Sequence, residues 1–134
     1  MGLIYTKLKL SNPKEDKLVH LEVEALVDTG AITLCIPEHV AVQLQLSELE
    51  RREVTTADGK HTSVLYVGPI QVGFSGRTCF TGALVLCDSV LLGAIPMEDM
   101  DLVISSRLQT VTVSPDSPNI PSAVVKPLYE KISA

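Results

Sequence analysis

The sequence predicts an all-β domain with one or two short helices. Turn signals recur at short spacing along the 134 residues, and the segments between them are rich in Val, Leu, Ile and Thr, which favour strands. Several of these segments alternate apolar and polar residues, as half-buried strands do. A chain of this length has room for one such domain.

The first two predicted strands are alternating segments separated by a turn. Residues 3–10 alternate and end at the turn-forming residues 11–16. Residues 17–27 alternate again and become wholly apolar at residues 25–27. We expect this second strand to begin half exposed and to end buried.

Two hairpins are predicted in the middle of the chain. The first spans residues 52–67 around Asp58-Gly59, a dipeptide common at hairpin tips because Gly tolerates positive φ. The second spans residues 70–86 and turns at residues 75–76. Further strands are expected at residues 90–92, 102–104 and 108–113.

Helical spacing is clearest in the segment after Pro37. Residues 38–44 place Val40 and Leu44 on one face, and proline fits the first turn of a helix. We expect residues 97–100 to form one turn at most.

The sequence also indicates how the chain is divided. Residues 1–113 contain the predicted strands and form the domain, whereas residues 114–134 carry four prolines among small and polar residues. Regular structure is disfavoured in this second segment. We expect an extended tail, which packs on its own domain or on a partner.

Composition and charge exclude several classes of function. The chain is 46% hydrophobic and 20% charged, so it can bury a core. Its net charge of −5 disfavours general binding to nucleic acid or to anionic lipid. No window is long and apolar enough to span a membrane.

The three cysteines predict the compartment. Cys35, Cys79 and Cys87 have no spacing typical of a zinc site, and their odd number leaves at least one unpaired. We expect all three to be reduced core residues of a cytoplasmic protein, with no metal and no cofactor.

The segment that carries chemistry is Leu-Val-Asp-Thr-Gly-Ala at residues 26–31, where a buried strand ends in a tight turn. A carboxylate in this position is costly unless it is hydrogen-bonded or has a function. One interpretation is structural, with Asp28 closing an Asx turn on the amides of Thr29 and Gly30. The other interpretation is catalytic.

A resemblance favours the catalytic interpretation. Residues 26–31 resemble the active-site loop of the retropepsin-like aspartic proteases. The hairpin at residues 58–59 stands where those proteins have their flap, and Val-Leu-Leu-Gly at residues 90–93 is similar to their apolar-apolar-Gly signature. The resemblance covers residues 3–113 and is greatest to the small prokaryotic members.

The resemblance implies a retropepsin-like acid-protease half-barrel that is active as a homodimer on peptide or protein substrates. Such enzymes need two carboxylates that share one proton, and this chain offers one Asp-Thr-Gly. Asp28 of a second copy would therefore supply the other carboxylate. In this family the hydroxyl of Thr29 bonds across the twofold axis, and Gly30 lets the backbone turn.

The resemblance also implies the substrate-binding residues. They are Ala31, Asp58, Gly59, Val64, Leu91 and Leu92. For Leu91 and Leu92, plain core packing is an equal alternative. The flap carries only Gly59, unlike the Gly-rich retroviral flaps, so a peptide-binding or scaffolding module with weak or no proteolysis is the alternative function.

Overall fold

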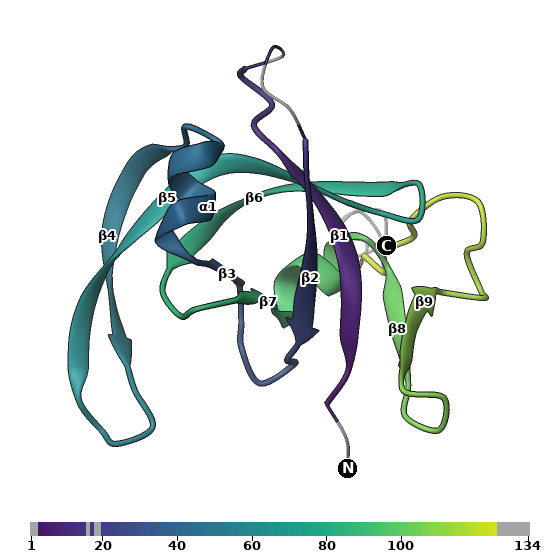
Figure 1. Ribbon diagram of the computed structural model, residues 1–134. Coiled ribbons are helices and arrows are strands. Elements are labelled where there is room, and N and C mark those ends of the chain that lie inside the picture. Colours follow the sequence, from purple (N-terminus) through teal and green to yellow (C-terminus); the bar gives the residue numbers. More distant parts are fainter. Residues whose placement is uncertain (1–2, 16, 18–19, 126–134) are drawn as a thin grey trace, which may run out of the picture.

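The computed structural model describes residues 3–15, 17 and 20–125 of the chain. These residues form nine strands and two short helices (Figure 1). The strands are β1 (Tyr5–Ser11), β2 (Leu21–Val27), β3 (Leu34–Ile36), β4 (Ser47–Thr55), β5 (His61–Phe74), β6 (Arg77–Val85), β7 (Val90–Leu92), β8 (Leu102–Ser105) and β9 (Thr110–Val113). The helices are α1 (Glu38–Gln43) and α2 (Ala94–Asp99).

Six of the strands close into a barrel. The larger sheet has the order β1-β2-β7-β3-β6-β5-β4, and β1 also pairs with β5. This second pairing joins the ends of the ring, and β4 is attached to β5 alone. Strands β8 and β9 form a separate two-stranded sheet. The all-β prediction is therefore confirmed.

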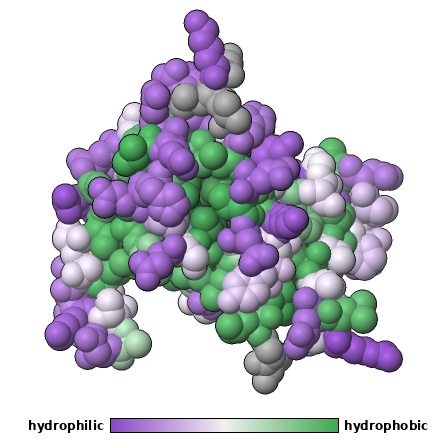
Figure 2. Space-filling view, in the orientation of Figure 1, coloured by the Kyte–Doolittle hydropathy of each residue, from purple (hydrophilic) through white to green (hydrophobic). Residues whose placement is uncertain are grey.

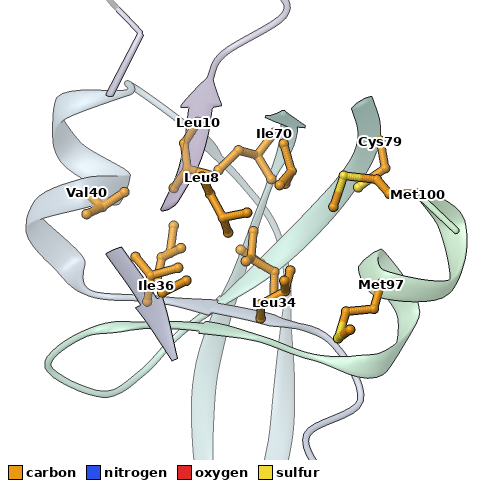
Figure 3. Packing of buried hydrophobic residues seen from close by; sticks show 14 of the residues in the cluster. Leu8, Leu10, Leu34, Ile36, Val40, Ile70, Cys79, Met97 and Met100 are labelled. Atoms are coloured by element: carbon orange, nitrogen blue, oxygen red, sulfur yellow. The ribbon is translucent and has the colours of Figure 1, made fainter. Parts of the chain in front are cut away.

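The barrel encloses an aliphatic core. Leu8 and Leu10 of β1 meet Leu34 and Ile36 of β3, and all four are almost completely buried (Figure 3). Burial of each such side chain is favourable by about 1.5–3 kcal/mol. Met97 of α2 enters the same cluster, so α2 covers one end of the barrel.

The long strand β5 differs from the prediction. Residues 61–74 form one strand, although the sequence indicated two separate segments on either side of Gly68 and Pro69. The pairing register with β6 shifts between Val67 and Ile70, which shows how the proline is accommodated. Proline cannot donate to a ladder, so it is tolerated at such an irregularity without ending the strand. The partner strand β4 also begins earlier than predicted, at Ser47.

The cysteine prediction is correct for two residues and wrong for the third. Cys35 and Cys79 are buried, and burial together with nearby Asp99 raises the pKa of the Cys79 thiol to about 12. Cys87 is exposed because it lies in the turn between β6 and β7, where it has a positive φ of 73°. All three thiols are free.

The described part of the tail packs on its own domain. Arg77 is 4% exposed and donates to the backbone carbonyls of Met100 at 2.9 Å and of Ser117. The carboxylate of Asp101 accepts from the Ser117 hydroxyl and from the amide of Ser122 at 2.9 Å. Residues 114–125 form no helix or strand, as predicted, and the rest of the predicted tail, 126–134, lies outside the described residues.

One face of the molecule has an apolar middle and a polar edge. Figure 2 shows hydrophobic residues gathered over the middle of one face, with hydrophilic residues around its edge and at its upper tip. Within the described part of the chain, neither helix is long or apolar enough to cross a membrane.

Candidate active site

The loop from Asp28 to Thr33 joins β2 to β3 at one end of the barrel. The backbone amide of Asp28 donates to the carbonyl of Leu92 at 3.0 Å, which fixes the point where β2 ends. The amide of Gly30 donates to Oδ1 of Asp28 at 2.9 Å. The Asx turn considered from the sequence is therefore present, and it orients the carboxylate.

The loop is held from behind by the start of α2. The amides of Ala94 and Ile95 donate to the carbonyls of Ala31 at 2.9 Å and of Ile32 at 2.8 Å. Gly93 lies so close to the backbone of Thr33 that no side chain fits between them. The Asp-Thr-Gly loop and the segment after β7 therefore form one rigid unit.

Asp28 and its neighbours face outward in the single chain. Asp28 is half-buried, and Thr29 and Gly30 are exposed. In the described residues no second carboxylate is bonded to Asp28, and no three His, Cys, Asp or Glu gather as metal ligands. One chain therefore provides one outward-facing carboxylate.

An apolar groove opens beside Thr29. Its volume is about 390 Å³, and it is lined by Ala94 and Met97 of α2 and by Leu102 and Ile104 of β8. Apolar surface next to an exposed catalytic-type loop is typical of a contact region.

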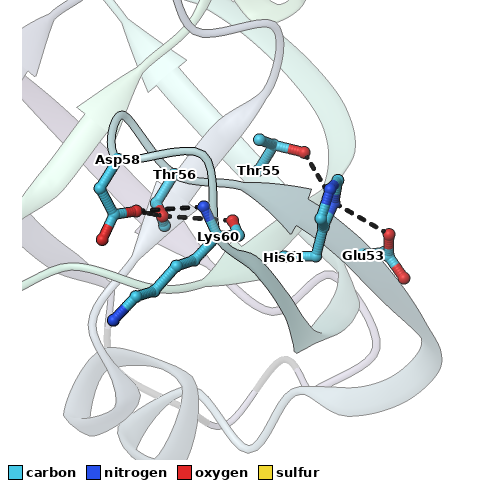
Figure 4. Close-up of polar contacts among 6 residues, drawn as sticks. All are labelled: Glu53, Thr55, Thr56, Asp58, Lys60 and His61. Atoms are coloured by element: carbon cyan, nitrogen blue, oxygen red, sulfur yellow. Dashed lines mark hydrogen bonds and ion pairs between the residues drawn. The ribbon is translucent and has the colours of Figure 1, made fainter.

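The β4–β5 hairpin reaches toward the same end of the barrel as the loop (Figure 1). At its tip Gly59 has a φ of 84°, which the predicted Asp-Gly turn requires. The Asp58 carboxylate accepts from the Thr56 hydroxyl and from the amide of Lys60 at 3.2 Å (Figure 4). The Thr56 hydroxyl and then the Lys60 amide lower the pKa of Asp58, because they stabilise its charged form.

A second set of polar contacts joins side chains on the two arms of the hairpin. Nδ1 of His61 lies 3.1 Å from the Thr55 hydroxyl and 3.2 Å from a carboxylate oxygen of Glu53 (Figure 4). All of these side chains are exposed, so the contacts contribute little to stability. Together with the bonds to Asp58 they limit the conformations of the hairpin tip.

The predicted substrate-binding residues fall into different environments. Ala31 is half-buried in the loop, and Asp58 and Gly59 are exposed at the hairpin tip. Leu91 is half-buried. Leu92 is completely buried, so its side chain belongs to the core, which was the alternative for this residue.

Val64 lies on β5 in the β4–β5 hairpin, which we call the flap. It is 8% exposed and pairs across the hairpin with Arg52. It does not line the groove between the flap and the loop, whereas its neighbour Val54 does.

Several residues of that groove were not predicted from the sequence. The groove has a volume of about 360 Å³ and lies between the flap arm and the loop after Asp28. Ile32 and Ile95 line one side, and Arg52 and Tyr66 line the other. The position of Ile32, directly after Ala31, was the one available signal.

Arg52 and Tyr66 form a fixed pair in this groove. The Arg52 guanidinium lies 3.6 Å from the centre of the Tyr66 ring and also binds Glu50 at 2.9 Å. The Tyr66 ring covers Gly82 so closely that any side chain there would displace it. The sequence does not predict which glycine lies beneath a large side chain, because this depends on how the two strands are aligned.

A family comparison agrees with this geometry. The protein-family model described as gag-polyprotein putative aspartyl protease matches residues 19–94, more than half of the chain. The chain belongs to this family of aspartyl proteases. The matched segment includes the Asp28 loop, the flap and Gly93. No curated protein matches the chain.

Membership of the aspartyl protease family confirms the resemblance to retropepsin-like proteins. It also supports the general function of an aspartic protease. A particular likeness to the small prokaryotic members stays a prediction.

Proposed function

We propose that this aspartyl protease is an endopeptidase that works as a homodimer, with one Asp28 from each chain. The observation that carries the proposal is the Asp-Thr-Gly loop itself, whose carboxylate is oriented by Gly30, faces outward and has no second carboxylate bonded to it in the part of the chain that the structure describes. A dyad of carboxylates is needed for this chemistry, so a second copy must complete it. Residues 1–113 make up the protease domain.

The proposed mechanism uses the dyad as both base and acid. The ionised Asp28 takes a proton from water while the water oxygen bonds to the carbonyl carbon of the peptide. The protonated Asp28 of the other chain donates its proton to the carbonyl oxygen. The Asp28 that took the proton from water then donates it to the peptide nitrogen as the carbon–nitrogen bond breaks. One hydroxyl of the diol returns its proton to the other Asp28, which leaves a carboxylic acid and an amine and restores the dyad.

Neighbouring groups assist the dyad. The Gly30 amide holds Oδ1 of Asp28 in place, so the carboxylate does not have to reorient during the reaction. We assign to the exposed hydroxyl of Thr29 a bond to the opposite loop across the twofold axis. The apolar groove beside Thr29 would lie at the contact between the two chains.

The proposed substrate is a peptide or protein with apolar residues at the cut bond. Ala31 and Leu91 would contact these side chains from the barrel, and the flap residues Asp58 and Gly59 would cover them. Val64 would support the flap from its buried position. The free thiols favour the cytoplasm as the compartment.

A peptide-binding module without proteolysis is the second candidate function. The observation that favours it is the flap, which has one glycine and whose tip is cross-bonded by Thr56, Asp58 and Lys60. A flap of this kind opens and closes less readily than a Gly-rich one.

The two candidates are separated by a cleavage experiment. The purified protein is incubated with a peptide library from acid to neutral pH, with and without a statine-type inhibitor. Cleavage that the inhibitor blocks and that Asp28→Asn abolishes supports the endopeptidase. Binding without cleavage supports the module, and a monomer by sedimentation that still cleaves peptides refutes the shared dyad.

A further inference from the structure

Strand β6 has a stretch of edge without a neighbouring strand. One edge of β6 pairs with β5 from Arg77 to Leu84, whereas β3 covers the other edge only from Ala83 to Val85. In residues 3–15, 17 and 20–125, no strand pairs with this second edge between Arg77 and Gly82. Such an edge offers backbone donors and acceptors to another extended segment.

A groove follows this edge, between β6 and α2. It has a volume of about 390 Å³, and its walls include Phe80 and Thr81 of β6 and Ile95 and Asp99 of α2. Thr81 and Ile95 also line the groove between the flap arm and the Asp28 loop. The edge groove is therefore continuous with the candidate active site.

The two connected grooves expose large apolar side chains. Ile32, Ile95 and Phe80 are 71%, 49% and 61% exposed. They follow one another from the active-site loop to the β6 edge, as their membership of the two grooves shows. Contiguous exposed apolar residues of this kind mark a binding surface.

The α2 side of the edge groove is negatively charged. Glu98 and Asp99 line it, and neither takes part in an ion pair within the described residues. Helix α2 ends at this point with no basic residue in its last turn. The Met100 carbonyl at this end already accepts from the Arg77 guanidinium at 2.9 Å, so the carboxylates of Glu98 and Asp99 supply the charge that would attract a basic side chain.

We propose that the edge groove extends the substrate site. A peptide bound at Asp28 continues past Ile32 and Ile95 and pairs as an added strand with the free edge of β6. One apolar side chain then lies against Phe80, and a Lys or Arg lies beside Asp99. This inference rests on the proposed function and defines its substrate class, an extended chain with a basic residue several positions from the cut bond.

The test compares peptides of different length. A core peptide that the protein cleaves is extended at either end by Lys-Thr-Val-Thr, by the same sequence with Glu in place of Lys, or by an N-methylated version that cannot pair as a strand. At one end, the Lys extension should raise kcat/KM about tenfold, the effect of a few added backbone and charge contacts. The Glu and N-methylated extensions should give much smaller gains. Equal values for all extensions at both ends would overturn the proposal.

Matched variants separate the groove from general charge effects. Asp99→Asn should remove the preference for Lys over Glu, and Asp88→Asn should keep it, because Asp88 is exposed outside both grooves. Phe80→Ala should reduce the gain from every extension. Asp88→Asn should also cleave the core peptide as the wild type does. A preference that survives in Asp99→Asn would contradict the assigned place of the basic residue.

The proposal remains testable if no peptide is cleaved, which would refute the proposed function alone. The peptide Lys-Thr-Val-Thr is then titrated into isotope-labelled Asp28→Asn protein. Shifts of the backbone amides of Phe80, Thr81 and Gly82 would support the groove, and unchanged amides would overturn it. Shifts that depend on protein concentration and not on peptide would assign the edge to a second copy, which also overturns the proposal.

Discussion

Gly93→Ala tests the rigid unit behind the active-site loop. A Cβ at Gly93 would lie 2.8 Å from the backbone N and C of Thr33 and closer still to its carbonyl oxygen, whereas ordinary contact begins at 3.4 Å. The two segments must therefore separate by about 0.6 Å or more. Gly93 has a φ of −88°, so backbone strain does not contribute.

The cost can be estimated from the contacts that hold these segments together. Forcing a methyl group into a packed site costs about 1–3 kcal/mol. Separation also weakens the bonds from Ala94 and Ile95 to the loop, each of which contributes about 0.5–1.5 kcal/mol. We expect the free energy of unfolding to fall by about 2–5 kcal/mol after the entropic gain of alanine is subtracted.

Urea denaturation followed by circular dichroism measures this change. Gly73→Ala is the matched control, because its Cβ would meet Lys9 at an ordinary 3.6 Å, and its stability should change by less than about 1 kcal/mol. Equal stabilities of the two variants would refute the close-packing argument. In the proposed enzyme, the displaced loop should also lower kcat/KM by up to about 100-fold.

Three further predictions concern individual side chains. Asp28→Asn should abolish cleavage while the fold is retained, and a mixed dimer with one wild-type chain should be nearly inactive; half of the wild-type rate in the mixed dimer would contradict a shared dyad. Iodoacetamide should label Cys87 alone in the native protein, with the rate rising at alkaline pH because partial desolvation and Asp88 raise the pKa of its thiol. Mass spectrometry that finds the buried thiols labelled first would refute this. The Ser117 hydroxyl and the Ser122 amide lower the pKa of Asp101, so its contribution to tail attachment should be full above about pH 4 and lost as the pH falls through the lowered value. The protection of the amides of residues 114–125 against hydrogen exchange, measured relative to the intrinsic exchange rate at each pH, should fall in acid, and the same protection at pH 2 and pH 6 would exclude this role.

The sequence was sufficient where local patterns determine the structure. The alternation that ends at Val27, the turn at Asp58-Gly59 and the Asp-Thr-Gly loop all depend on residues close together in the chain, and each lies where it was expected. The family match confirms the interpretation of these patterns as an aspartyl protease.

Contacts between distant segments could not be predicted in the same way. The burial of Leu92 depends on β7 lying between β2 and β3, and the cover of Gly82 by Tyr66 depends on the register of β5 and β6. The exposure of Cys87 depends on one positive φ in a turn with no glycine. No short sequence pattern reports such pairings, because they arise from the way in which the barrel closes.

The continuity of β5 has a mechanical consequence for the flap. Its first residues form one arm of the flap, and its last residues pair with β1 and β6 in the barrel wall. Pairing with β6 begins at Tyr66 and continues beyond the shift between Val67 and Ile70, so β5 is held in the barrel wall from Tyr66 onward. We therefore expect any swing of the tip to bend the strand just before Tyr66, whose ring lines the groove between the flap and the Asp28 loop.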